Sequence, residues 1–219
     1  MWSSEVTNMI ITGIWETLYM TLVSTLVGYV IGLPMGIILT VSDKDGIKPN
    51  AVLYKILDVI ANIVRSVPFI ILLVLLIPFT RLVVGKSYGS TATIVPLVIA
   101  AAPYIARMVE SSLKEVDAGV IEAARSMGAS NFTIITKVML VEARTSLLVG
   151  ATITLGTILG YSAMSGAVGG GGLGTIAIRY GYTRWQTDIM IVTVILLIIL
   201  FQIFQTVGMK LADKFDHRK

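Results

Sequence analysis

Few side chains in this sequence have the type and spacing that catalysis or metal binding requires. The one histidine, His217, lies in a charged tail, and cysteine is absent. A histidine-based triad or a metal site with His or Cys ligands is therefore not expected. Gly85-Lys86-Ser87 resembles the end of a phosphate-binding loop, but Thr80 stands where that loop needs its first glycine. We predict no catalytic residue, no metal and no nucleotide cofactor in this chain.

The polar segment 110–145 carries more information. Asp117 is a favourable N-cap and Gly128 a favourable C-terminal glycine for a short helix between them. Its side chains separate onto two faces, with Val120, Ile121, Ala124 and Met127 on one and Glu122, Arg125 and Ser126 on the other. Ser130 and Asn131 can cap a second helix. The first helix could lie on a membrane surface, stiffen a loop or dock on a partner, and the pattern leaves these alternatives open.

The composition decides what surrounds these residues. Of the 219 residues, 55% are hydrophobic and only 14% are charged, against roughly 25% charged in soluble domains. A core of this size cannot bury so much apolar surface, so membrane lipid must solvate the chain. The net charge of +4 is thinly spread, which makes nucleic acid an unlikely partner.

Five apolar segments are long enough to cross a bilayer as helices, which takes roughly 20 residues each. The predicted spans are 14–40, 56–79, 91–109, 146–164 and 188–211. They exceed the roughly ten residues of a barrel strand and do not alternate between apolar and polar residues. We predict an all-α, polytopic membrane protein with a long loop at 110–145 and a short charged tail at 212–219.

The distribution of basic residues predicts the orientation. Most of the 17 lysines and arginines lie in the first and third connections and in the C-terminal tail, and none precedes the first span. Under the positive-inside rule, the N-terminus lies outside and the C-terminus in the cytoplasm. The same rule makes the loop 110–145 cytoplasmic.

Several motifs resemble those of ABC-importer permeases. Glu122-Ala123-Ala124, three further residues, Gly128, and then Val138 and Leu140 match the cytoplasmic-loop motif of that family, although Val141 replaces its usual proline. Arg65-Ser66-Val67-Pro68 is also similar to a stretch of these permeases. The segment 160–164, followed by the glycine-rich run 169–174, is similar to permeases of methionine importers in particular. The resemblance covers about 13–211, which would form one transmembrane domain.

The resemblance implies a transport subunit in the cytoplasmic (inner) membrane that is not itself an enzyme. Two copies would form a pathway for methionine, in its D- or L-form, on two ATPase subunits that bind ATP and Mg²⁺. An extracytoplasmic solute-binding protein would deliver the substrate. The coupling residues would be Glu122, Ala123, Ala124, Arg125 and Gly128.

The resemblance also implies a pathway or gate formed by Tyr161, Met164, Gly169 and Gly170, with Arg65 at a cytoplasmic vestibule. Each of these features has a simpler interpretation. The glycines suit a flexible outer loop, Met164 suits ordinary packing, and Arg65 suits an anchor that extends toward the interface.

There are three alternatives to a methionine permease. The chain could be a permease for another amino acid or a small organic solute. An ion-coupled secondary carrier would need ionisable residues deep in the spans, and the span centres contain almost no carboxylates. An intramembrane enzyme lacks a recognisable nucleophile–base pair.

Overall fold

The computed structural model describes residues 4–215, and these residues fold as helices and connecting turns without a strand. The prediction of an all-α chain is therefore confirmed. His217 and the rest of the predicted tail beyond 215 lie outside the described residues. The α-helices are α1 (Ser4–Ser42), α2 (Ala51–Ser66), α3 (Phe69–Leu75), α4 (Ile77–Val84), α5 (Ser90–Lys114), α6 (Ala118–Ser126), α7 (Asn131–Thr133), α8 (Leu140–Glu142), α9 (Arg144–Met164), α10 (Gly172–Ile176) and α11 (Thr187–Lys214).

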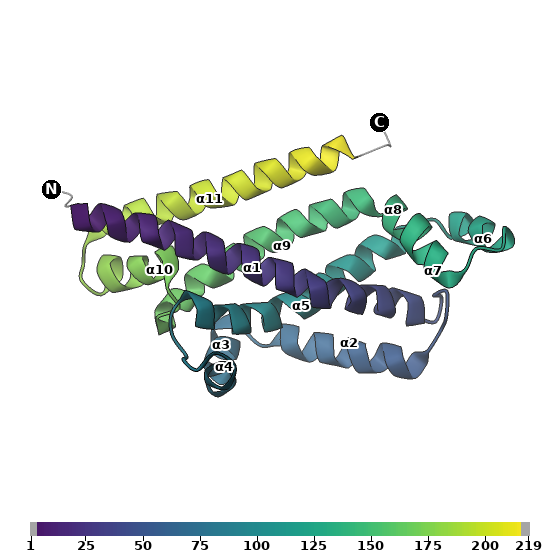
Figure 1. The fold of residues 1–219 in the computed structure, drawn as a ribbon, viewed down its shortest axis with the longest axis horizontal. Helices are drawn as coiled ribbons and strands as arrows, with labels where there is room; N and C mark the ends of the chain where they lie inside the picture. The colour runs from purple at the N-terminus through teal and green to yellow at the C-terminus, as the bar shows by residue number, and fades with distance from the viewer. Residues whose placement is uncertain (1–3, 216–219) are drawn as a thin grey trace.

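The long helices lie side by side along one axis of an elongated molecule (Figure 1). The helix α10 lies at one end of this axis, and α6, α7 and α8 lie at the other (Figure 1). The described chain begins at the α10 end and finishes toward the opposite end (Figure 1).

Four stretches are long and apolar enough to cross a membrane: α1, α5, α9 with the short helices that follow it as far as Tyr182, and α11. Taken together, α2 and α3 are also long and apolar enough to cross, but their axes are bent by 101° relative to each other. The number of candidate spans is thus four, or five if the bent pair is one span, in agreement with about five predicted.

This bend corrects the prediction of one continuous helix over 56–79. Val67 leaves the helical region, with φ −83° and ψ 125°, immediately before Pro68. The proline ring disfavours helical geometry in the residue before it and supplies no backbone N–H. Pro68 therefore separates α2 from α3, and α4 begins at Ile77 with Pro78 in its first turn. A measure of hydropathy alone does not detect these breaks.

The other helices extend beyond their predicted limits. α1 begins at Ser4 rather than near 14, and α11 continues to Lys214, into the segment 212–219 that was expected to be a tail. α5 continues to Lys114 rather than stopping at 109, and it passes through Pro96 and Pro103. Glu110 and Lys114 consequently belong to a helix and not to the loop.

A row of glycines allows α1 and α5 to pack closely. A Cβ atom on Gly28 would lie 2.9 Å from the Cβ of Ala101, and one on Gly32 would lie 2.6 Å from the carbonyl oxygen of Ala102. Gly36 would meet the carbonyl oxygen of Ala106 at 2.6 Å. Small residues at four-residue spacing thus bring two helix backbones together, as is common within membranes.

Candidate functional site

The predicted short helix is present as α6, and both of its ends form as the sequence indicates. Asp117 Oδ1 accepts a hydrogen bond from the Gly119 N–H at 2.7 Å. Gly128 has a φ of +80°, and a Cβ there would meet no atom within 4 Å. A glycine is therefore favoured at 128 by its left-handed backbone and not by lack of space. Ser130 caps the next turn by accepting a hydrogen bond from Thr133 N–H at 3.2 Å.

The apolar face predicted for α6 is divided in the structure. Ala124 is buried and Ile121 half-buried against the main hydrophobic core. Val120 is exposed, and Met127, at 82% exposure, projects away from the core. Phe132, on α7, is 76% exposed. The apolar face that the spacing predicts is therefore not buried as a whole: its Ala124 side packs on the core, and Val120 and Met127 remain exposed.

The polar residues of α6 face outward or toward the turn after α1. Glu122, Ala123 and Arg125 are exposed. Arg125 Nη2 donates a hydrogen bond to the carbonyl oxygen of Ile47 at 3.1 Å, which ties α6 to the connection between α1 and α2. A cavity of about 490 Å³ lies beneath the helix, and both Glu122 and Arg125 line it.

Sequence reasoning missed a charged cluster beside this cavity. Glu110, only 5% exposed, accepts hydrogen bonds from Arg107 at 2.7 Å and from Lys114 at 2.8 Å. Arg107 also pairs with Asp58 on α2, and Lys114 pairs with Asp43, just after α1, at 2.6 Å. The cluster joins α1, α2 and α5. The spacing of Arg107, Glu110 and Lys114 along α5 could have indicated their pairing, whereas the contacts with Asp58 and Asp43 join distant parts of the chain.

The cation of Lys114 controls the charge state of its partner at the end of α1. Its hydrogen bond to Asp43 holds the pKa of that carboxyl below the ordinary value of 3.8, despite the opposing effect of burial. Asp43 is therefore ionised at neutral pH, and the ion pair is fully formed. Within residues 4–215, no three His, Cys, Asp or Glu residues come together as a metal site would require.

The structure brings Arg65 and Tyr161 together near the bend between α2 and α3. Both line a cavity of about 180 Å³ that also includes Tyr104. The ring of Tyr161 stacks on Phe69, with centroids 4.4 Å apart and planes at 2°. Figure 1 shows this bend near the middle of the long axis, away from α6.

Met164 lies one helical turn beyond Tyr161, at the end of α9, and is 51% exposed. The glycine-rich run that follows is closely packed. Gly169 has a φ of +77° and its carbonyl accepts a hydrogen bond from Gly89 N–H at 2.9 Å. The Gly170 carbonyl accepts one from Thr93 Oγ1 at 3.0 Å. These bonds hold the run against α5, so the interpretation as a flexible loop does not describe this structure.

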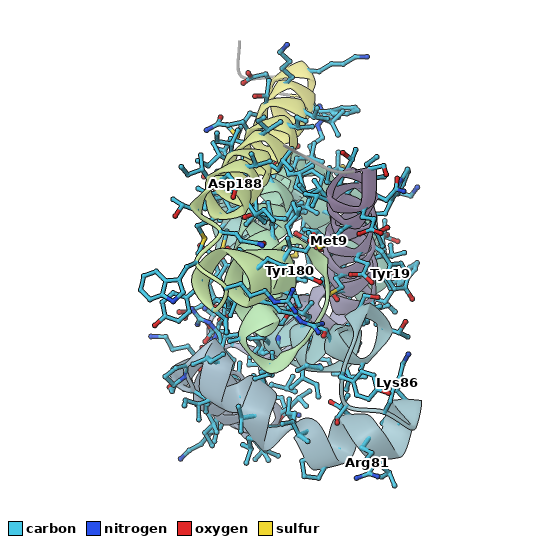
Figure 2. All side chains as sticks on the ribbon, turned by 90° about the vertical axis from the view of Figure 1, so that its left-hand side faces the viewer. Met9, Tyr19, Arg81, Lys86, Tyr180 and Asp188 are labelled. Carbon is cyan, nitrogen blue, oxygen red and sulfur yellow. The ribbon has the colours of Figure 1, made fainter. Side chains whose placement is uncertain are left out.

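The N-terminus of α10 is capped from α1. Gly172 N–H donates to Glu16 Oε2 at 2.6 Å, and Leu173 N–H donates to Thr17 Oγ1 at 2.9 Å. Figure 2 looks onto this end of the molecule, with Tyr180 near its centre and Arg81 and Lys86 at its lower edge. The residues proposed for a pathway thus form two groups, Arg65 with Tyr161 in the central cavity and Met164 with the glycines toward the α10 end.

Comparisons with known proteins show the family of this chain. The family described as binding-protein-dependent transport system inner membrane component matches residues 32–218. A protein of Vibrio cholerae, described as a probable D-methionine transport system permease, is 49% identical over 217 residues, covering 99% of this chain and 96% of that protein. The D-methionine transport system permease of Escherichia coli K12 is 52% identical over 158 residues, covering 72% of this chain and 73% of that protein.

Two solved structures extend the comparison. A chain of the inward-facing MetNI methionine ABC transporter, in its native crystal form, superposes with a TM-score of 0.97 at 49% identity, covering 99% of this chain and 100% of that chain. An amino acid ABC transporter with histidines gives a TM-score of 0.73 at 22% identity, covering 98% and 96% of the two chains, and shows the fold alone.

Proposed function

This chain belongs to the family of binding-protein-dependent transport system inner membrane components, and from that premise we propose that it is the permease subunit of an ATP-driven methionine importer. The observation that carries the proposal is 49% identity with a D-methionine permease over 99% of this chain. As in its family, it would cross the cytoplasmic (inner) membrane several times. ATP hydrolysis would belong to a separate subunit.

Two copies of the chain would form the pathway, each in contact with one of two ATP-binding-cassette subunits that hold ATP and Mg²⁺. An extracytoplasmic solute-binding protein would supply the substrate. The family's own description as binding-protein-dependent supports this last partner.

The surface for the ATPase would be α6 and the turn after it, with Glu122, Ala123, Ala124, Arg125 and Gly128 as coupling residues. The exposed side chains of Val120, Met127 and Phe132 support this assignment, because apolar groups at an aqueous end of a membrane protein commonly mark a contact surface. The hydrogen bond from Arg125 to Ile47 would pass movement of α6 to α1 and α2.

The substrate pathway would pass Arg65 and Tyr161 in the central cavity and Met164 toward the α10 end. Gly169 and Gly170 would fix the turn that holds Met164 in position, as their bonds to α5 suggest. Nucleotide binding would close the ATPase pair, move α6, and shift the permease pair between two rigid-body states. Arg65 would lie at a cytoplasmic vestibule of this pathway.

The test is uptake of labelled methionine into proteoliposomes that contain this chain, its ATPase and its binding protein. Uptake should require ATP, and Gly128→Val should reduce it while the variant still assembles. Gly85→Val is the matched control: Gly85 has a φ of +81° and open space around it, but it caps α4 far from α6. Equal loss in both variants would contradict a coupling role for Gly128 and indicate general strain.

The same preparation separates the alternatives. Faster uptake of another amino acid than of methionine would identify a different substrate. Uptake driven by an ion gradient without the ATPase would identify a secondary carrier.

A further inference from the structure

The central cavity is lined by residues of α2, α3, α5 and α9 around the bend after α2. Its lining consists of Val64, Arg65, Val67, Phe69, Leu72, Ala100, Tyr104 and Tyr161. At about 180 Å³, it is smaller than the roughly 300–1,000 Å³ typical of drug-sized pockets. The cavity therefore suits a small solute.

Arg65 is the one charged side chain in this lining. Within residues 4–215, it takes part in no hydrogen bond and no ion pair at ordinary distances, whereas Arg107, in the neighbouring α5, is bound by Asp58, Asn62 and Glu110. An arginine inside a membrane-spanning segment is costly, and it usually faces a partner or a water-filled cavity. The unpaired guanidinium thus has the geometry and the charge to bind an anionic group from outside the chain.

The cavity lining also contains an aromatic pair. The stacked rings of Phe69 and Tyr161 are parallel to within 2°, and Leu72 and Ala100 add apolar surface beside them. Flat aromatic faces and edges make favourable contacts with a thioether sulfur about 5 Å away. A charged side chain and an aromatic pair in one lining match a solute that has both a carboxylate and an apolar side chain.

We propose that this cavity binds the substrate during transport, with the Arg65 guanidinium paired to the α-carboxylate of an amino acid and the Phe69–Tyr161 stack against its side chain. The planar guanidinium can hold both carboxylate oxygens. This inference rests on the proposed function, because it assigns a place within the pathway to the solute that the importer carries.

The experiment uses the permease–ATPase complex without its binding protein, so that the binding protein cannot select the ligand. A diazirine analogue of methionine is activated by light on the complex, and the labelled peptides are identified by mass spectrometry. The label should fall on peptides that contain Phe69 or Tyr161. Excess methionine should prevent the labelling, and 3-(methylthio)propylamine, which lacks the carboxylate, should not.

Two substitutions test the guanidinium. Arg65→Gln should lower labelling of these peptides about 10- to 100-fold, the range for losing a hydrogen bond to a charged group, and Arg65→Lys should retain part of it. Arg81→Gln is the control, because Arg81 is an exposed arginine on α4 outside the cavity lining. Assembly of each Arg65 variant with the ATPase is verified by co-purification before the labelling.

The outcomes distinguish this inference from the proposed function. If the unaltered importer takes up methionine but the label falls elsewhere, or if Arg65→Gln and Arg81→Gln label equally, the binding site is wrong and the transport assignment stands. If the unaltered importer does not take up methionine, the proposed function fails and the inference fails with it.

Discussion

Lys114, the last residue of α5, donates a hydrogen bond to Asp43, the first residue after α1, and the two charged atoms are 2.6 Å apart. The same ammonium group also reaches Glu110 at 2.8 Å. One side chain therefore connects the ends of two long helices directly below α6. Any movement of α6 that reached the long helices would act on this connection.

Glu110 should be the most sensitive member of the charged cluster. It is nearly buried between Arg107 and Lys114, and removing one partner of a buried ion pair typically costs about 3–5 kcal/mol. We expect Glu110→Gln to lower the thermal midpoint of the purified permease clearly. The control is Lys44→Gln, which breaks an ion pair with Asp45 that is 85% exposed on both sides and should cost less than about 1 kcal/mol. Similar midpoints for the two variants would contradict a structural role for the cluster.

The pair of Asp43 and Lys114 predicts a specific dependence on pH. The pKa of Asp43 is lowered from 3.8, so its contribution to stability is present above that value and is lost as pH falls through the lower folded pKa. The stability difference between the unaltered protein and Asp43→Asn should stay constant from about pH 8 to about pH 5 and shrink only below about pH 4. Thermal midpoints across this range test the prediction, and a difference that disappears already near pH 6 would contradict it.

The row of glycines in α1 should tolerate no added side chain. A methyl group on Gly32 would lie 2.6 Å from the carbonyl oxygen of Ala102, and overpacking of this kind typically costs about 1–3 kcal/mol. Gly32→Ala should therefore lower the thermal midpoint. Gly160→Ala is the matched control, because a Cβ there would meet no atom within 4 Å. Equal effects would show that helix propensity, and not the approach of α1 to α5, decides the outcome.

The cap that Glu16 provides to α10 should be visible in hydrogen exchange. Its carboxylate accepts the Gly172 N–H at 2.6 Å, and loss of a helix cap typically costs about 1 kcal/mol. Glu16→Ala should increase amide exchange of peptides that contain 172–176 and leave those from α6 unchanged. Glu5→Ala removes an exposed carboxylate from the start of α1, the helix that also carries Glu16. This control should leave amide exchange unchanged in both α10 and α6. Unchanged exchange at α10 in Glu16→Ala would show that Thr17 and packing hold this end without the carboxylate.

Local signals in the sequence were sufficient for α6. Asp117 and Gly128 act through the backbone within a few positions of themselves, so the start and end of the helix follow from residue type and spacing alone. The membrane location likewise follows from composition. The spacing of Glu122, Gly128 and Leu140 resembles a motif of the family, and the family model and the relatives show membership. In contrast, the outward orientation of Met127 depends on how α6 packs on the turn after α1, which the spacing does not contain.

The bend at Pro68 falls between these two cases. Proline indicates a break in the helix. Hydropathy does not indicate it, because hydropathy measures transfer into lipid and not backbone geometry, and the run across 56–79 is apolar throughout the break. The angle of 101° is set by where α3 finds its packing partners.

The sequence by itself determined that the chain is helical, lies in a membrane and carries a capped helix with a permease motif. These properties arise from the chemistry of each residue and its near neighbours along the chain. Only the tertiary structure decided that Asp43 meets Lys114, that Arg107 meets Asp58, and that Arg65 shares a cavity with Tyr161. Such pairs bring together residues on different helices, and the packing of the helices against one another determines which side chains meet.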